Sequence, residues 1–279
     1  MKTAATVPGP VDPKRRHRTY GVIVEIAGTP ILFETDDLEF RAIIESRYEG
    51  FLKPLATPKY RFKIQLAASE VESDKDVQVS RKDSVWFLER GDFRADWDLQ
   101  TGVGHVFQSP NPYSLDTVLR IVHSLVLAEQ GGFLLHAASA IRNGHASIFA
   151  GVSGAGKTTL ARLAPPDAIV LTDEISYIQR HDDAYRAHGT PFAGELARLG
   201  KNVSAPLAEL YLLEKGPENR VQPIEPLAAA RALMRHILFF ANDEEMVKNV
   251  FDSVMTFVSA VPIARLMFTP DERAWELIQ

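Results

Sequence analysis

A glycine-rich stretch has the residue types and the spacing of a phosphate-binding loop. It matches the pattern G-x-x-x-x-G-K-[ST] at every fixed position, as Gly151, Val152, Ser153, Gly154, Ala155, Gly156, Lys157 and Thr158. In such a loop, backbone N–H groups surround a phosphate, the lysine contacts the β- and γ-phosphates, and the hydroxyl binds Mg²⁺. We therefore predict a nucleotide site at these residues and Thr159, with ATP and Mg²⁺ as cofactors. The alternative is an ordinary glycine-rich turn with a surface lysine.

Two acidic residues, Asp173 and Glu174, follow the apolar run at 168–171. An acid at the end of a strand beside a phosphate loop can bind Mg²⁺ or activate an acceptor hydroxyl. Adjacent strand residues point to opposite faces, so both can reach one site only if the chain bends at Thr172. Otherwise they are two solvated acids that close a strand.

His136 lies inside the apolar run at 133–138. A histidine in such a run either serves the site or makes a buried hydrogen bond in the core, and both interpretations stay open. The candidate catalytic residues are Lys157, His136 and one of the two acids, Asp173 or Glu174, with the other acid at Mg²⁺.

The elements around the loop are those that a phosphate loop needs. A short apolar run at 146–150 predicts a strand before it, and 158–164 predicts a helix that stops at Pro165. Apolar residues at helical spacing predict a helix at 115–129. Further strands are expected at 133–138, 168–171, 175–180, 207–213 and 263–268, and helices at 226–240, 243–259 and 271–278.

The first part of the chain has a different pattern. Residues 1–18 contain prolines and a basic cluster and predict a flexible tail. Residues 19–110 predict a β-rich α+β region, and residues 111–279 the core around the loop. Within the β-rich region we expect a hairpin at 20–33, a helix ending near Tyr48, strands at 60–66, 77–80, 85–88 and 93–99, and a turn at 102–104.

Composition limits the function. Hydrophobic residues make up 46% of 279 residues, which is enough for a sizeable core. The net charge of −5 predicts no nucleic-acid or membrane partner, and the lack of cysteine excludes disulfides and cysteine nucleophiles. The N-terminus shows no signal segment, so we expect a cytoplasmic location.

The order His136, phosphate loop containing Ser153, apolar strand and acidic pair resembles the C-terminal domain of HPr serine kinase/phosphorylase. This resemblance implies an α/β fold with a P-loop kinase core of the HPr kinase / phosphoenolpyruvate carboxykinase type and a mixed sheet. It also implies that Asp173 is the acid/base carboxylate, that Glu174 is linked to Mg²⁺, and that His136 lies near the transferred phosphate.

The chain departs from this family at several points. Thr159 stands where the bifunctional enzymes commonly have glutamate, the pair is Asp-Glu rather than Asp-Asp, and no Pro-Gly-Arg segment is found. These departures argue against HPr as the substrate. The chain is more similar to HPr-kinase-related proteins of bacterial biosynthetic clusters, some of which resemble peptide-tailoring serine kinases.

The sequence thus predicts an ATP- and Mg²⁺-dependent kinase whose acceptor is a peptide, a protein or a small-molecule alcohol. The alternatives are a non-catalytic nucleotide-binding regulator and a P-loop NTPase without an acceptor. The acceptor, the base of the nucleotide and homo-oligomerisation stay open. The loop at 188–195 is predicted to be a moving lid in which Phe192 covers a ligand. Candidate cations for the transferring charge are Arg198, Lys201, Arg220 and Arg265.

Overall fold

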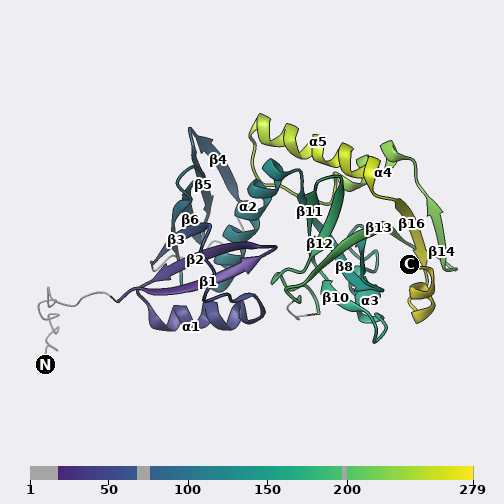
Figure 1. Cartoon of the computed structure of the whole chain (residues 1–279), viewed down its shortest axis with the longest axis horizontal. Helices are drawn as coiled ribbons and strands as arrows, with labels where there is room; N and C mark the ends of the chain where they lie inside the picture. Colours follow the sequence, from purple (N-terminus) through teal and green to yellow (C-terminus); the bar gives the residue numbers. More distant parts are fainter. Residues whose placement is uncertain (1–17, 68–75, 197–199, 279) are drawn as a thin grey trace, which may run out of the picture.

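The computed structural model describes residues 18–67, 76–196 and 200–278, and it contains two mixed sheets that follow one another along the chain (Figure 1). The fold class is therefore mixed α/β, as expected. The predicted tail at 1–18 lies, apart from Arg18, outside the described residues.

The first sheet has seven strands in the order β1-β2-β3-β7-β6-β5-β4. The pairs β2/β3 and β3/β7 are parallel and the others are antiparallel. Buried and exposed residues alternate along β3, so one face of the sheet carries the core. The elements of this part are β1 (Tyr20–Ile26), β2 (Thr29–Thr35), α1 (Leu38–Arg47), η1 (Glu49–Phe51), β3 (Tyr60–Leu66), β4 (Gln78–Lys82), β5 (Val85–Arg90), β6 (Phe93–Asp98) and β7 (Val103–Gln108).

Strand β7 corrects one expectation. The glycines at 102 and 104 were expected to mark only a turn, but the chain turns at Gly102, with φ +71°, and Gly104 already lies in the strand. A Cβ at Gly104 would lie 2.6 Å from the Phe62 ring and 2.5 Å from the Asp96 carbonyl oxygen. This glycine therefore permits close packing inside the sheet.

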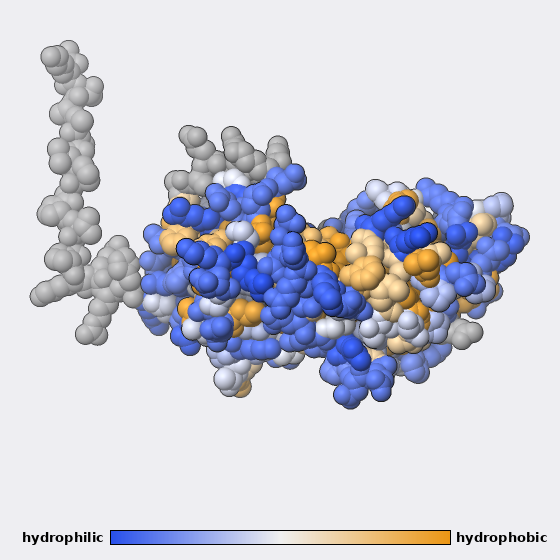
Figure 2. All heavy atoms as spheres, turned by 90° about the horizontal axis from the view of Figure 1, so that it is seen from above, coloured by the Kyte–Doolittle hydropathy of each residue, from blue (hydrophilic) through white to orange (hydrophobic). Residues whose placement is uncertain are grey.

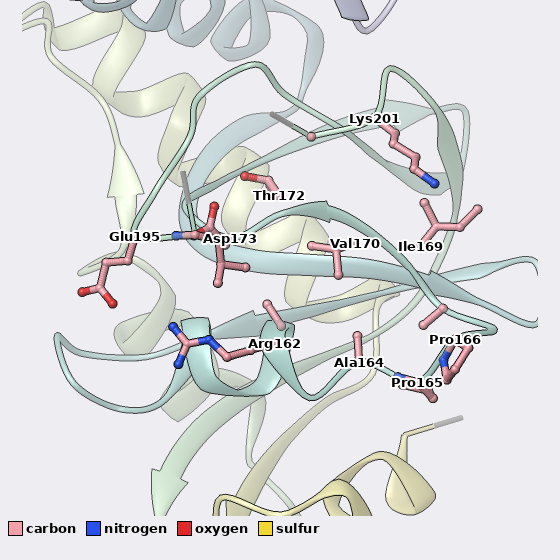
Figure 3. Close-up of a pocket in the computed structure, with 14 residues that line it drawn as sticks. Arg162, Ala164, Pro165, Pro166, Ile169, Val170, Thr172, Asp173, Glu195 and Lys201 are labelled. Atoms are coloured by element: carbon pink, nitrogen blue, oxygen red, sulfur yellow. The ribbon is translucent and has the colours of Figure 1, made fainter. Parts of the chain in front are cut away.

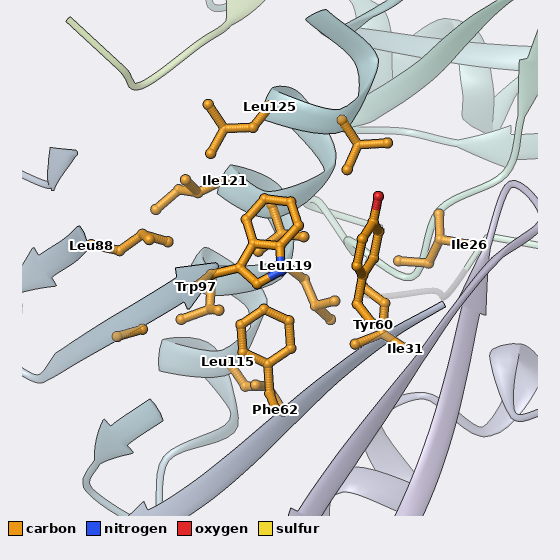
Figure 4. Close-up of a cluster of buried hydrophobic side chains, with 14 of the residues drawn as sticks. Ile26, Ile31, Tyr60, Phe62, Leu88, Trp97, Leu115, Leu119, Ile121 and Leu125 are labelled. Carbon is orange, nitrogen blue, oxygen red and sulfur yellow. The ribbon is translucent and has the colours of Figure 1, made fainter. Parts of the chain in front are cut away.

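Helix α2 (Pro112–Gln130) joins the two halves of the core. Asn111 caps its start through its side chain, and Gly131 ends it in the left-handed conformation. Its buried Leu115 and Leu119 pack against aromatic side chains of the first sheet (Figure 4). The same core cluster continues into the second half of the chain through Ile175, Tyr177, Phe192 and Met246.

The second sheet has nine strands. Seven follow the order β10-β8-β11-β12-β13-β16-β14, while β15 pairs with β8, and β9 pairs with both β8 and β13. Its elements are β8 (Phe133–Arg142), β9 (His145–Ala150), α3 (Lys157–Arg162), β10 (Ile169–Thr172), β11 (Ile175–His181), β12 (Ala184–His188), β13 (Ser204–Lys215), β14 (Arg220–Pro223), α4 (Pro226–Leu233), β15 (Ile237–Leu238), α5 (Glu244–Ala260), β16 (Ile263–Phe268) and η2 (Glu272–Leu277).

Helices cover both faces of this sheet. Alternate residues of β9 point to opposite faces, and Ile148 belongs to the cluster that contains Leu233 of α4 and Phe257 of α5. Phe149 belongs to another cluster, with Leu160 of α3 and Trp275 of η2. The loop between β9 and α3 is therefore anchored by apolar packing on both sides.

Helix α4 is shorter than expected. The sequence predicts a helix over 226–240, but α4 ends at Leu233 and the chain returns to the sheet as β15. Ile237 and Leu238 pair with Leu135 and Leu134 of β8. Strand pairing across about 100 residues overrides the local helical pattern here.

The molecular surface is mainly hydrophilic when the molecule is seen from above, with scattered hydrophobic residues (Figure 2). Among the exposed apolar side chains are Val247 and Phe251 of α5. Within the described part of the chain, no helix combines the length and the apolarity that crossing a bilayer requires.

Candidate active site

The predicted phosphate loop is a tight connection between β9 and α3. Gly154 and Gly156 have φ values of +75° and +109°, which side-chain-bearing residues rarely adopt. A Cβ at Gly156 would also lie 2.5 Å from the ring of Phe268. Both the backbone path and the packing therefore require glycine at position 156.

Strand register brings the loop and His136 together. Ala150, the last residue of β9, pairs with Ala137 of β8, so Gly151 starts next to His136. His136 itself pairs with Ile175, the first residue of β11. Three segments that are distant in sequence thus meet at one point of β8.

The acidic pair lies at a bend, as the sequence requires if both acids are to reach one site. Thr172 ends β10, and its Oγ1 accepts hydrogen bonds from the backbone N–H groups of Glu174 and Ile175, both at 3.2 Å. Thr172 pairs with Ser139 of β8, whereas Ile175 pairs with His136. The two residues in the bend therefore leave the sheet beside the loop, and both line the same pocket.

Asp173 is fixed by the segment that follows β12. Its Oδ1 accepts a hydrogen bond from the backbone N–H of Gly194 at 3.0 Å, and its Oδ2 accepts one from Leu196 at 2.9 Å. A Cβ at Gly194 would lie 2.8 Å from Asp173 Oδ2 and 2.6 Å from Glu174 Oε2. Gly194 thus lies against both carboxylates, and Asp173 is only 5% exposed.

The pocket formed by these segments has a volume of about 350 Å³. Most of the predicted site residues line it, but Gly151, Val152 and Ala155 do not: Val152 is 67% exposed, and Ala155 packs in the core. The lining consists of His136, Ser153, Gly154, Gly156, Lys157, Thr158, Thr159, Asp173, Glu174, Glu195 and Lys215.

Lys157 is buried, and its ammonium group bonds to the loop itself. Its Nζ donates to the carbonyl oxygen of Gly151 at 2.9 Å and to that of Val152 at 3.4 Å. Burial lowers the pKa of the ammonium group, while Glu174 and Glu195 act in the opposite direction. The pocket therefore combines one buried cation with three carboxylates.

His136 is half-buried and faces this charged group. Burial lowers its pKa from the ordinary value of 6.5, and the charge of Lys157 lowers it further, so the ring is neutral at pH 7. His236 lies close by, because its backbone carbonyl oxygen accepts a hydrogen bond from the backbone N–H of His136 at 2.7 Å. Its pKa is also lowered, first by burial and then by Lys157 and His136.

Three cationic or titratable residues near the pocket escape sequence analysis. Lys215 ends β13, which is parallel to β9, so it emerges at the same edge of the sheet as the loop. His236 is brought in by the pairing of β15 with β8. Arg120 lies in α2, where burial lowers its pKa and the charge of Glu174 acts against this. None of these positions shows a local motif.

The cations expected from the sequence lie elsewhere. Arg220 and Arg265 form ion pairs with Glu218 and Glu214 at 3.6 Å and 3.2 Å. Lys201 lines a neighbouring pocket, and Arg198 lies outside the described residues.

The expectation that Phe192 covers a ligand is not met. Phe192 is 1% exposed and belongs to the core cluster that α2 shares with the first sheet. Thr190, two residues earlier, donates its hydroxyl to the Ile175 carbonyl oxygen at 2.8 Å. The first part of the 188–195 segment is therefore anchored in the core.

The oxygen ligands present suit Mg²⁺ in combination with a polyphosphate. Among the described residues, no group of three or more histidine, aspartate or glutamate side chains could hold a metal alone. Mg²⁺ usually takes one or two carboxylates, substrate phosphates and several waters. Glu174, Asp173 and Thr158 offer hard oxygen atoms to one pocket and fit this requirement.

Comparison with known proteins gives a matching family and a similar solved structure. A family model described as "SynChlorMet cassette protein ScmC" matches residues 112–279. A solved structure of the Hpr(Ser) kinase/phosphatase from Coxiella burnetii matches at 9% identity over 48% of this chain and 84% of that chain, with a TM-score of 0.26. This TM-score is too low for residue-level comparison. No curated protein matches.

Proposed function

The chain belongs to the family described as SynChlorMet cassette protein ScmC, and we propose that it is an ATP- and Mg²⁺-dependent kinase. Its acceptor is a hydroxyl group, on a serine of a peptide or protein or on a small-molecule alcohol. The observation that carries this proposal is the convergence of Lys157, Asp173 and Glu174 in one pocket.

Each residue of the pocket has a role in this proposal. The loop N–H groups and Lys157 bind the phosphates of ATP, for which Lys157 exchanges its carbonyl partners for phosphate oxygens. Thr158 and Glu174 hold Mg²⁺, which, when bound, neutralises negative charge on the phosphates. Neutral His136 donates a hydrogen bond toward the transferring group.

Asp173 accepts the proton of the acceptor hydroxyl. The acceptor oxygen forms a bond to the γ-phosphorus while the bond from that phosphorus to the β–γ bridging oxygen breaks, so the products are ADP and a phosphate ester. The backbone N–H groups of Gly194 and Leu196 each occupy one lone pair of the carboxylate, and a further lone pair on each oxygen remains for the proton.

The arrangement of two carboxylates favours a kinase over a simple nucleotide sensor. A sensor needs the loop and the lysine, but it has no need of a buried carboxylate held by two backbone N–H groups beside them. An NTPase would use the same residues with water as the acceptor. The two activities therefore differ only in the molecule that receives the phosphoryl group.

Thermal unfolding with nucleotide tests the binding step. Millimolar ATP with Mg²⁺ should raise the melting temperature of the wild-type protein, because a ligand that binds only the folded state stabilises it. Lys157→Ala should lose most of this shift, whereas the matched control Lys63→Ala, at an exposed site in β3, should keep it. An unchanged wild-type melting temperature would contradict the nucleotide site.

Transfer of label from γ-labelled ATP tests the reaction. We expect labelled ester on an acceptor in the presence of wild-type protein and none with Lys157→Ala. Release of inorganic phosphate alone, with every peptide and alcohol tested, would instead support the NTPase.

A further inference from the structure

A second pocket, of about 700 Å³, is also lined by Asp173 (Figure 3). Strand β10 forms one side of it, and the C-terminal part of α3 and the turn after α3 form the other side. Asp173 and Glu195 line both this pocket and the pocket that contains Lys157. The two cavities therefore meet at the carboxylate that the proposed function makes the base.

Phosphoryl transfer requires the attacking oxygen and the leaving oxygen to lie roughly in line with the phosphorus. The leaving group lies on the side of Lys157, so the attacking hydroxyl must approach from another side, within reach of Asp173. The second pocket is lined by the same Asp173. We infer that this second pocket binds the acceptor, an inference that rests on the proposed function. The acceptor is a serine-containing peptide segment with an acidic residue near the serine.

The charged side chains that line the pocket determine how a peptide is oriented in it. Asp173 and Glu195 lie at one end, together with Arg162, and Lys201 lies at the other end (Figure 3). The side chains of Arg162 and Lys201 are exposed and make no hydrogen bond or ion pair with any other described residue. The end with Asp173 and Glu195 keeps a net negative charge, because Arg162 offsets only one of the two carboxylates, whereas the other end carries Lys201. An acidic group therefore lies at the Lys201 end when the hydroxyl lies at Asp173.

The wall between the two ends is apolar and is formed in part by an edge strand. Half-buried Ala164, Ile169 and Val170 line it, together with Pro165. Strand β10 is the first strand of the sheet order, and it pairs with β8 and with no other described strand. At Leu171 the strand is already covered, because a Cβ at Gly200 would lie 1.9 Å from the Leu171 carbonyl oxygen. The part of the strand at 169–170 can add an extended peptide through main-chain hydrogen bonds, which favours a peptide over a small alcohol.

The test is phosphorylation of a positional-scanning library of serine peptides by the full chain with labelled ATP and Mg²⁺. The measured quantity is the ratio of labelling between peptides with aspartate or glutamate and peptides with lysine, at each position around the serine. For the wild type we expect an acidic preference of about tenfold at one or two positions. Lys201→Gln should reduce this ratio, and Lys201→Glu should invert it.

Lys63→Glu is the matched control, because it makes the same change of charge at an exposed position of β3 and should leave the ratio as in the wild type. Equal labelling of acidic and basic peptides by the wild type would overturn the inference while the kinase proposal stands. If ATP did not raise the melting temperature of the wild-type protein, the proposed function itself would be overturned.

A substitution that fills the second pocket tests whether the acceptor or the nucleoside part of ATP binds there. Ala164→Phe places a large side chain in the pocket, and Ala164→Ser does not. If the acceptor binds here, Ala164→Phe should raise the KM for peptide at least tenfold and keep the ATP-induced melting shift. Loss of that shift in Ala164→Phe, but not in Ala164→Ser, would place the nucleoside in the pocket and overturn the inference.

Discussion

The guanidinium carbon of Arg120 lies 5.0 Å from the centroid of the Phe192 ring. Its buried Nε has no hydrogen-bond partner among the described residues. Burial lowers the pKa of this guanidinium, and the carboxylates of Asp116 and Glu174 oppose the effect. A partly buried positive charge is thus held by a ring face and two nearby carboxylates.

We expect Arg120→Met to separate stability from activity. Methionine keeps the length of the apolar stem and removes a poorly solvated charge, so the melting temperature should be at least as high as that of the wild type. Phosphate transfer should fall about 10-fold or more, because the positive field at Glu174 and His136 is lost. Arg120→Lys should retain part of the activity. Full transfer activity in Arg120→Met would remove Arg120 from the reaction.

Asp173→Asn should retain nucleotide binding but lower transfer by about 10²–10⁴-fold, the range for loss of a positioned base. An amide cannot take up the proton, and its NH₂ group faces one of the two backbone N–H donors at 194 and 196. Transfer rates at saturating ATP provide the measurement. A rate within a few-fold of the wild type would show that Asp173 is not the base.

Glu174→Gln should behave differently, because the change removes charge from the proposed metal site. The Mg²⁺ concentration for half-maximal transfer should rise, and saturating Mg²⁺ should recover part of the rate. A titration of Mg²⁺ at fixed ATP distinguishes the two variants. An identical Mg²⁺ dependence in Glu174→Gln and the wild type would contradict the assignment.

Gly194→Ala should damage the site without a change in any charged group. The added Cβ would lie within 2.8 Å of an oxygen of each carboxylate, so the segment or the acidic pair must shift. We expect transfer to fall at least 10-fold, with a melting temperature close to that of the wild type. Gly50→Ala, where nothing lies within 4 Å of the new Cβ, is the matched control and should keep full activity.

His123→Phe should make the protein less sensitive to acid. Burial in the core lowers the pKa of His123 to about 3, and its ring contacts Tyr177 edge-on with centroids 5.5 Å apart. Below the ordinary pKa of 6.5 the unfolded chain binds a proton that the folded chain does not, so stability falls as the pH falls. Phenylalanine keeps the ring contact and removes this proton.

Urea unfolding of both proteins between pH 7 and pH 5 is the measurement. The free energy of unfolding of the variant should gain on that of the wild type by about 1.4 kcal/mol per pH unit below pH 6.5. If the free energies of unfolding of the two proteins depended on pH in the same way, His123 would take up a proton in the folded protein.

The local parts of the site could be predicted from the sequence, because contiguous residues specify them. The strand, the glycine loop and the helix around Lys157 follow from one motif and its flanks. The bend at Thr172 follows from the demand that two adjacent acids reach one pocket, and the hydroxyl of Thr172 supplies its hydrogen bonds.

The rest depends on pairings between distant segments, which no local pattern specifies. Lys215 reaches the pocket because β13 runs parallel to β9, and His236 because β15 pairs with β8. Gly194 contributes by having no side chain, which the sequence cannot separate from an ordinary loop glycine. The glycines around Phe192 predict a hinged lid, but tertiary packing, which no local pattern specifies, buries Phe192 in the core.

Helix α2 also bears on how such a protein can be inherited and rearranged. The matched family region begins at residue 112, the first residue of α2, yet one face of this helix is covered by side chains from before residue 100. A gene fusion that exchanged only the N-terminal sheet would expose Leu115, Leu119 and their neighbours to water as an apolar patch that is prone to aggregation. Descendants that keep residues 112–279 must therefore keep, or newly acquire, a layer that fits over α2.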